Sequence, residues 1–357
     1  MDEQYTPIIS EEERAARRAS RAEARRRKQQ ELRRRRMKQL LPAAAFLLIL
    51  AVILLVRNGG GKQETETPEA QATPISAPAV IPEEPEAPYA AAETASTVHL
   101  SDGINSGYAV VIDLQSDTIL AEKNARAVIS PASMTKIMTL LVAVENLKSL
   151  SDTVSITIEI TDYCYVNGCS VVGYEIGETV TVQELLYGTI LPSGADASLA
   201  LAAYVAGSQE AFVELMNQKA EELGLSETTH FTNCVGIYDE KHHCTVYDMA
   251  MILKAAMDND LCRQVLSAHT YQTAPTEQHP EGQPLSNWFL RRIEDHDTEQ
   301  AVRAVGAKTG YVVQSGSCAA SWGEDDAGNR YICVTGDASS SWQAIFDHVT
   351  LYGEYCK

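Results

Sequence analysis

Runs of apolar and β-branched residues, separated by turn residues, lie at both ends of the second part of the chain. They predict strands over residues 108–114, 118–122, 301–308, 317–322 and 330–334. The polar stretch 324–329 predicts a turn between the last two strands. Two strands near residue 110 and three near residue 320 indicate a sheet assembled from distant segments.

Between these strands, apolar residues recur every three or four positions, which predicts helices. Ser130 and Pro131 suit the N-cap and first position of one helix, and Thr181 and Glu184 form a capping box that opens another. Further helices are predicted over residues 196–205, 208–224, from 245 onward and 342–355. Strands at both ends with helices between them predict one α+β domain, an antiparallel sheet covered by helices.

The N-terminal part has a different pattern. Residues 40–56 contain no charged side chain and, as a helix, reach roughly 25 Å, near the lower limit for spanning a bilayer. The preceding residues 1–39 hold 13 Lys and Arg, which predicts a cytoplasmic N-terminus. We therefore expect a basic cytoplasmic tail (1–39) and a transmembrane signal-anchor helix (40–57) that fixes the protein in the cell membrane as a single-pass protein. The alternative, a cleaved secretory signal, has a shorter basic region and an A-x-A site.

Residues 58–97 are rich in Pro, Glu, Ala and Thr and predict a disordered linker. Residues 98–357 form the predicted extracellular domain, with 14 Lys and Arg against 34 Asp and Glu. The 357-residue chain has a net charge of −19, which argues against nucleic acid as its main partner. The arginine run at 33–36 is the one segment that suits nucleic acid, and a topology signal explains it more simply.

All eight cysteines follow the apolar segment, and an even number in an exported domain predicts disulfides. Sequence proximity and the predicted hairpin suggest the pairs Cys164–Cys169, Cys234–Cys244 and Cys318–Cys333, which leaves Cys262–Cys356 by elimination. A zinc site that includes His242, His243 and Cys244 is the competing interpretation, although no CxxC or HExxH spacing supports it.

Three short segments carry candidate chemistry. Ser133 and Lys136 are three residues apart on a predicted helix, so they share a face, and a lysine with a lowered pKa can activate a serine. Ser193 lies in a loop between two helices, where it can relay a proton or cap the next helix. Lys308-Thr309-Gly310 ends a predicted strand, whose edge can pair with an extended peptide while the glycine lets that peptide come close.

The order and spacing of these segments resemble the penicillin-recognising serine acyl-enzymes. SxxK is followed about 60 residues later by an SxN-like segment and about 115 residues after that by KTG. GYAVVIDLQSDTILAEKNA, SPASMTKIMT, ILPSGADAS and FTNCVGIYDEKHHCTVYDMA are similar to segments of the D-alanyl-D-alanine carboxypeptidases, the low-molecular-mass penicillin-binding proteins. The resemblance implies a β-lactamase/DD-peptidase-like α+β fold, with about five antiparallel strands flanked by helices and an all-helical part.

The resemblance also implies roles for individual residues. Ser133 is the expected nucleophile, Lys136 its base, and Ser193 the donor of a proton to the departing D-Ala. Lys308 and Thr309 are expected to hold the terminal carboxylate, beside Gly310. The backbone N–H groups of Ser133 and Tyr311 are expected to form the oxyanion hole.

The reaction implied is removal of the terminal D-Ala from peptidoglycan stem pentapeptides through a serine ester, with no cofactor and no metal. The expected partners are stem peptides, β-lactam antibiotics as covalent inhibitors, and the membrane through the N-terminal helix.

One departure is Ala195, which stands where the family's second motif usually has asparagine, and alanine has no polar atom to orient Lys136. A catalytically impaired peptidoglycan-binding protein is therefore one alternative, and a DD-endopeptidase acting on cross-links is another. A class A β-lactamase is disfavoured because no asparagine in the chain has glutamate four residues before it.

Overall fold

The computed structural model describes residues 89–296 and 301–356. The expected basic tail, the expected transmembrane helix and most of the expected linker lie outside these residues. Among the helices that are described, none combines the length and the apolar character needed to cross a bilayer. The linker was expected to reach residue 97, whereas the structure forms strand β1 over Ala92–His99.

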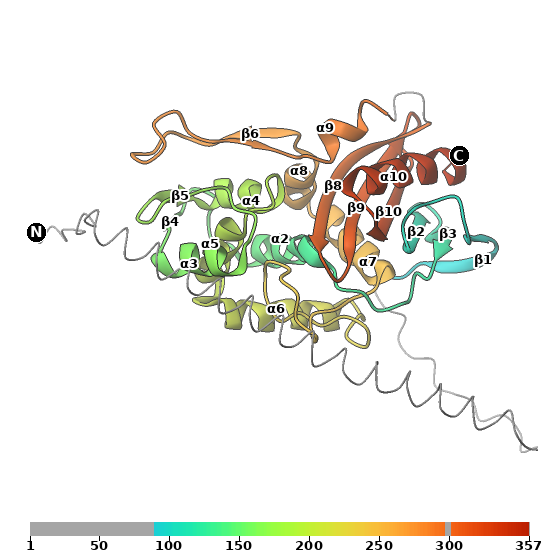
Figure 1. Cartoon of the computed structure of the whole chain (residues 1–357), viewed down its shortest axis with the longest axis horizontal. Coiled ribbons are helices and arrows are strands. Elements are labelled where there is room, and N and C mark those ends of the chain that lie inside the picture. Colours follow the sequence, from blue (N-terminus) through green and yellow to red (C-terminus); the bar gives the residue numbers. More distant parts are fainter. Residues whose placement is uncertain (1–88, 297–300, 357) are drawn as a thin grey trace, which may run out of the picture. The chain divides into compact units, whose positions relative to one another are not determined.

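A six-stranded mixed sheet forms one side of the described domain, on the right in Figure 1. Its order is β1-β3-β2-β10-β9-β8, and its other strands are β2 (Tyr108–Asp113), β3 (Thr118–Lys123), β8 (Val302–Val312), β9 (Gly316–Asp325) and β10 (Arg330–Ala338). The expected sheet of about five antiparallel strands corresponds to β3-β2-β10-β9-β8. The sixth strand, β1, pairs in parallel with β3 and lacks the apolar alternation that marks the others.

Both faces of the sheet are buried, because alternate residues of each strand point to opposite sides. On β2, Val110 and Ile112 join the main core with the helices, and Ala109 and Val111 join a second core on the other face. Helix α10 (Ser341–Tyr355) packs over β8, β9 and β10 on that second face (Figure 1). The near-continuous apolar runs in these strands follow from this double covering.

Helix α2 (Thr135–Asn146) links the sheet to the helical part of the domain (Figure 1). Nine of its residues are buried, and it contacts helices on several sides. The surrounding helices are α3 (Ile158–Asn167), α4 (Val182–Ile190), α5 (Ala195–Ala206), α6 (Gln209–Glu222), α7 (Val246–Asp258) and α8 (Asp260–Ser267). Short elements complete the domain: η1 (Ala132–Met134), α9 (Leu290–Ile293), and the strand pairs β4 (Thr153–Ser155) with β5 (Thr179–Thr181) and β6 (Thr270–Gln272) with β7 (Pro284–Ser286).

The helix starts follow the capping signals in most cases. The predicted box at Thr181 and Glu184 is present, with reciprocal side chain–backbone bonds, and Ser208 caps α6 through the Ala211 N–H. The expected cap at Ser130 is wrong: a 3₁₀ turn at Ala132–Met134 precedes α2, and the Ser130 hydroxyl has no hydrogen-bond partner in the described part of the chain. The chain therefore reaches α2 through a tighter turn than the Ser-Pro signal indicates.

The expected disulfides are not formed among the described residues. Cys318 pairs in register with Gly310 on β8, and Cys333 pairs with Ser321, so these two cysteines are not opposite each other. Cys262 and Cys356 belong to separate hydrophobic cores. Cys164 and Cys169 do lie close together, as their spacing in the sequence suggested. A hydrogen bond between their sulfur atoms takes the place of the expected disulfide.

The remaining expected pair, Cys234–Cys244, is also separated. The Cys234 thiol contacts the Ser198 carbonyl and the Gln209 amide oxygen, whereas Cys244 forms an isolated β-bridge with Ile129. Seven of the eight cysteines are buried, and they fill the cores as small apolar side chains.

Candidate active site

Ser133 lies in the 3₁₀ turn that leads into α2. The residue before it, Ala132, has a φ of +49°, a left-handed conformation that costs free energy for a side chain other than glycine. Thr135 stabilises this turn by donating its hydroxyl proton to the Ala132 carbonyl at 2.7 Å. The backbone is therefore strained next to the candidate nucleophile and held in place by a neighbouring side chain.

A buried histidine supports the same turn from the other side. The Thr232 N–H donates to His242 Nδ1 at 3.0 Å, and His242 Nε2 lies 2.8 Å from Thr135 Oγ1. Burial lowers the pKa of His242 to about 4, so the ring is neutral at pH 7 and its Nε2–H donates to Thr135. His242 was considered above as a zinc ligand, but here both ring nitrogens are occupied by the protein.

Lys136 is 2% exposed, and its ammonium points to the candidate nucleophile. Its Nζ donates to Ser133 Oγ at 3.1 Å and to the Val235 carbonyl at 2.6 Å. Burial lowers the pKa of Lys136 to about 8, because the charged form is poorly solvated there. A neutral amine at this position can take the Ser133 proton.

The Val235 carbonyl is held by the loop around it. Asn233 Oδ1 accepts the N–H groups of Val235, Gly236 and Ile237 at 3.2, 2.7 and 3.0 Å. Gly236 has a φ of +79°, and a Cβ there would lie 1.9 Å from the Ala132 carbonyl oxygen. Only glycine therefore allows this loop to pack against the turn that carries Ser133.

Lys308 and Ser193 form the second half of the site. Lys308 Nζ donates to Ser193 Oγ at 2.9 Å and to the Thr309 carbonyl at 2.7 Å. Burial, and then the nearby charge of Lys136, lower the pKa of Lys308 well below its usual value. Ser193 has a φ of +61°, so it too is a strained residue beside reactive groups.

Gly310 joins the two halves. A Cβ at Gly310 would lie 2.9 Å from the Ser133 nitrogen and 3.0 Å from the Pro131 carbonyl oxygen. Glycine was expected here to admit a substrate backbone, but in the structure its immediate role is to let β8 approach the Ser133 turn. Thr309 is partly exposed, and Tyr311, with 65% of its surface exposed, follows on the same strand.

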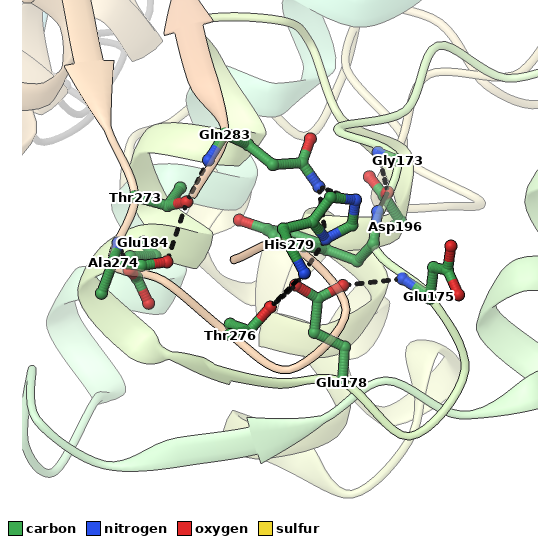
Figure 2. Close-up of polar contacts among 11 residues, drawn as sticks. Gly173, Glu175, Glu178, Glu184, Asp196, Thr273, Ala274, Thr276, His279 and Gln283 are labelled. Atoms are coloured by element: carbon green, nitrogen blue, oxygen red, sulfur yellow. Dashed lines mark hydrogen bonds and ion pairs between the residues drawn. The ribbon is translucent and has the colours of Figure 1, made fainter. Parts of the chain in front are cut away.

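Asp196 does not take the place of the missing asparagine. Its carboxylate accepts the N–H group of Gly173 at 2.9 Å (Figure 2). It also accepts the N–H groups of Val172 at 2.9 Å and of Tyr174 at 3.3 Å. Asp196 therefore fixes the segment beside α5. Ala195 is buried, and its N–H donates to the Ser170 carbonyl at 2.8 Å, which ties the same segment to the second motif.

A second buried carboxylate, Glu178, follows the segment that Asp196 holds, and we call residues 170–178 the wall beside α5. Glu178 is 1% exposed and accepts hydrogen bonds from the Glu175 N–H and the Thr276 hydroxyl, both at 2.8 Å (Figure 2). His279 Nδ1 lies 2.9 Å from the same carboxylate. Because Thr276 and His279 belong to the loop between β6 and β7, Glu178 docks that hairpin onto the segment that Asp196 holds.

Sequence reasoning brought Ser133, Lys136, Ser193 and the KTG strand to one place, and the structure does the same. It missed the Val235 carbonyl, Asn233 and Gly236, although FTNCVG was noticed as a segment. Asn233 and Gly236 form an N-x-x-G pattern, which is typical of a tight turn capped by the asparagine side chain. This pattern could have predicted the turn. The Asp196 and Glu178 contacts had no local signal.

A strained serine turn, a buried lysine on the serine oxygen and a second lysine–serine pair on a strand edge define a serine acyl-transfer type of site. The model of the family described as D-alanyl-D-alanine carboxypeptidase, Peptidase_S11, matches residues 93–340. The chain therefore belongs to this family.

Curated relatives agree with the family assignment. The chain is 41% identical over 146 residues to the D-alanyl-D-alanine carboxypeptidase DacF of Bacillus subtilis, which covers 41% of this chain and 37% of the relative. It is 31% identical over 221 residues to DacB2 of Mycobacterium tuberculosis, covering 61% and 70%. The match with DacF and with Escherichia coli DacC (38% covered) thus spans about two fifths of each relative.

Solved structures share the fold. The Streptomyces K15 DD-transpeptidase superposes with a TM-score of 0.63 at 28% identity, covering 71% of this chain and 98% of that one. A D-alanyl-D-alanine carboxypeptidase from Mycobacterium tuberculosis gives a TM-score of 0.62 at 26% identity and covers 73% and 95%. The fold is therefore the DD-peptidase fold that the sequence motifs indicate.

Proposed function

We propose that the protein removes the terminal D-Ala from peptidoglycan stem pentapeptides through a serine acyl-enzyme. The observation that carries the proposal is the contact of the Lys136 amine with Ser133 Oγ, beside the Lys308–Ser193 pair. The family and the printed names of the relatives support the same reaction. A transpeptidase neighbour uses the same fold, so hydrolysis rather than transfer is part of the proposal.

The proposed reaction balances as two acyl transfers. Neutral Lys136 takes the Ser133 proton as Oγ attacks the carbonyl carbon of the penultimate D-Ala. The N–H groups of Ser133 and Tyr311 stabilise the oxyanion. The peptide C–N bond then breaks, Ser193 passes a proton to the leaving amine of D-Ala, and the proton that Lys136 took from Ser133 replaces the one that Ser193 gave. A water molecule then hydrolyses the ester: its oxygen and one proton stay on the shortened peptide as the carboxyl group, and its other proton returns to Ser133 Oγ.

The electrostatics of the site favour an anionic substrate. Two lysines are buried close together, and their hydrogen bonds go to hydroxyl and carbonyl oxygens. A bound carboxylate favours the charged form of Lys308, whose pKa is otherwise lowered by burial. The proposed requirement for a free C-terminal carboxylate follows from this arrangement, with Lys308 and Thr309 as its ligands.

We further propose that residues 40–57 anchor the protein in the cell membrane with the 98–357 domain outside, where stem peptides and β-lactam antibiotics reach it. The apolar run and the basic residues before it support this proposal. External protease added to intact cells should degrade the domain and leave a short N-terminal fragment in the membrane fraction. Protection of the whole chain in intact cells would contradict this topology.

Covalent labelling tests the nucleophile. The wild-type full chain should bind fluorescent penicillin covalently. Ser133→Ala should not, because alanine lacks the hydroxyl oxygen that forms the ester. Ser226→Ala, at an exposed position outside the site, is the matched control and should label like wild type. Equal labelling of Ser133→Ala and wild type would reject Ser133.

Release of D-Ala from a synthetic pentapeptide then tests turnover. Ala195 is the observation that favours the impaired-binder alternative, because neither Ala195 nor Asp196 supplies the amide of the usual motif. Labelling without D-Ala release would establish that alternative. Release from a cross-linked dimer but not from a pentapeptide would establish an endopeptidase.

A further inference from the structure

A cavity of about 310 Å³ lies at the end of the segments that build the active site. Each of its walls continues one of those segments along the chain. Ile129 and Ser130 precede Ser133, residues 238–240 follow the Val235 loop, and residues 314–315 follow strand β8. Asp337, at the end of β10, closes the cavity. The cavity is thus separate from the Lys136 and Lys308 contacts but adjoins them in the chain.

The lining of the cavity suits a cation. It includes the carboxylates of Asp239, Glu240 and Asp337, and no lysine or arginine of the described chain lines it. His242, which also lines it, is neutral at pH 7 because burial lowers its pKa to about 4. The cavity lining is therefore acidic, whereas the neighbouring active site contains two buried lysines.

Two unpartnered hydroxyls add a second, independent feature. Ser130 Oγ and Ser315 Oγ are both buried without a hydrogen-bond partner in the described part of the chain, and both residues line the cavity. Ser315 is only 5% exposed. Buried hydroxyls are normally hydrogen bonded, so they are available acceptors for a ligand N–H. Asp337 has a φ of +58°, a strained conformation that also occurs at Ala132 and Ser193.

The apolar rim of the cavity suits a long side chain that ends in the cation. Val128 and Tyr238 line the cavity and have 57% and 41% of their surfaces exposed. Tyr311 and Val313, on and just after β8, are also exposed. A methylene chain can pack on such residues while its terminal amine reaches the carboxylates.

The direction of the substrate is set by strand β8, which is an edge strand with a free side. Along β8, Lys308 is the proposed ligand of the terminal carboxylate, and Tyr311, three residues on, is the proposed oxyanion donor. A peptide paired antiparallel to β8 therefore runs its N-terminal part toward residues 314–315. Residues 313–315 form the turn directly after β8, and the Ser315 N–H donates to the Val312 carbonyl at 3.1 Å, so this side of the cavity lies beside the end of the strand that the peptide pairs with.

We propose that this cavity binds the cationic primary amine on the side chain of the residue that precedes D-Ala-D-Ala in the stem peptide. The inference rests on the proposed function and adds a preference for a substrate with a free side-chain amine. Asp239, Glu240 and Asp337 supply the charge, and Ser130 and Ser315 accept N–H groups. The cavity therefore acts in the recognition of the peptide and takes no part in bond cleavage.

Two peptides test the proposal on the full chain. One is a pentapeptide with a lysine before D-Ala-D-Ala, and the other is the same peptide with that lysine Nε-acetylated. Wild type should release D-Ala from the amine peptide about 10-fold faster in kcat/KM, since three exposed carboxylates each contribute a small factor. For each protein, kcat/KM for the amine peptide is divided by kcat/KM for the acetylated peptide. A substitution that alters the reactivity of Ser133 changes both values equally and leaves this ratio unchanged.

The variant Asp239→Asn/Glu240→Gln/Asp337→Asn should reduce this ratio to about 1. Asparagine tolerates the left-handed conformation at 337, and each single substitution should give an intermediate ratio if the triple variant does not fold. The matched control, Glu221→Gln/Glu227→Gln/Asp326→Asn, removes the same charge from exposed positions outside the cavity and should keep the wild-type ratio.

A wild-type ratio near 1, or equal ratios in the cavity and control variants, would overturn the inference and leave the proposed function standing. Absence of both D-Ala release and penicillin labelling would instead reject the proposed function, and the inference with it. If the protein is labelled but releases no D-Ala, the two peptides are compared as competitors of labelling, and the same ratio decides.

Discussion

The proton on Lys136 controls the chemistry at Ser133. Nζ lies 3.1 Å from Ser133 Oγ, and the amine can accept a proton only in its neutral form. Burial, which lowers the pKa of Lys136 to about 8, makes that form accessible near neutral pH. In water an ordinary lysine with a pKa of about 10.4 would be almost wholly charged there.

We therefore expect the rate of acylation by a penicillin to rise with pH and to level off above about pH 8. Below about pH 7 the rate should fall about tenfold per pH unit, because protonated Lys136 cannot take the Ser133 proton. Lys136→Arg should lose this limb, since a guanidinium stays charged. Stopped-flow acylation between pH 6 and 9 measures both profiles, and identical profiles would contradict the role of Lys136.

Most of the reactive side chains could be predicted because their spacing along the chain carries the information. Ser133 and Lys136 share a face at a separation of three residues, whether the turn is 3₁₀ or α. The Val235 carbonyl could not be predicted in this way, because a backbone oxygen has no residue type. The role of Asp196 was also hidden, since its partners are backbone N–H groups more than 20 residues earlier.

At the scale of elements, the carboxylate of Asp196 holds the wall beside α5 in place through hydrogen bonds to its backbone. Asp196 is 2% exposed and accepts the N–H groups of Val172, Gly173 and Tyr174, so its two oxygens replace the partners that these groups have in water. The same segment connects to Glu178, which binds the β6–β7 hairpin. Loss of this carboxylate should loosen the wall while leaving the Lys136–Ser133 contact.

Asp196→Asn should lower the free energy of unfolding by about 1–3 kcal/mol, because the amide NH₂ faces backbone donors and leaves at least one of them unsatisfied. The rate of acylation by penicillin should fall as well, and its pH midpoint should move slightly lower, because the charge of Asp196 raises the pKa of Lys136. Urea unfolding and the pH profile of acylation measure the two effects. Glu221→Gln, at an exposed position, is the control, and unchanged unfolding in Asp196→Asn would disprove the positioning role.

Elements with a strong local signal were predicted, and elements built by tertiary contacts were not. The Thr181 capping box marks α4, and the apolar runs mark β2 and β10. Strand β1 has mostly polar, exposed residues and exists because it pairs with β3. Helix α3 has only Ile160 and Cys164 buried, so its apolar periodicity is weak.

At the scale of the whole molecule, the cysteines determine how stability depends on pH. Burial raises the pKa of six thiols: Cys234, Cys244, Cys262, Cys318, Cys333 and Cys356. A group whose pKa is raised on folding contributes stability below its unfolded pKa and loses it as the pH rises. The two buried lysines work in the opposite sense, because their pKa values are lowered.

The six thiols outnumber the two lysines, so the free energy of unfolding should fall above about pH 8.5. At pH 9.5, about one unit above the ordinary thiol pKa, each buried thiol costs about 1.4 kcal/mol, and the two buried lysines offset part of this sum, because an unfolded lysine has a pKa of about 10.4. Urea unfolding under reducing conditions at pH 7.5 and 9.5 measures this loss. Cys244→Ala/Cys333→Ala should lose about 3 kcal/mol less than wild type over the same interval, since two of the thiols that ionise on unfolding are gone. Two outcomes would contradict this prediction: equal stability of wild type at the two pH values, or the same loss in the double variant as in wild type. Either would show that ionisation of the buried thiols on unfolding does not control the pH dependence.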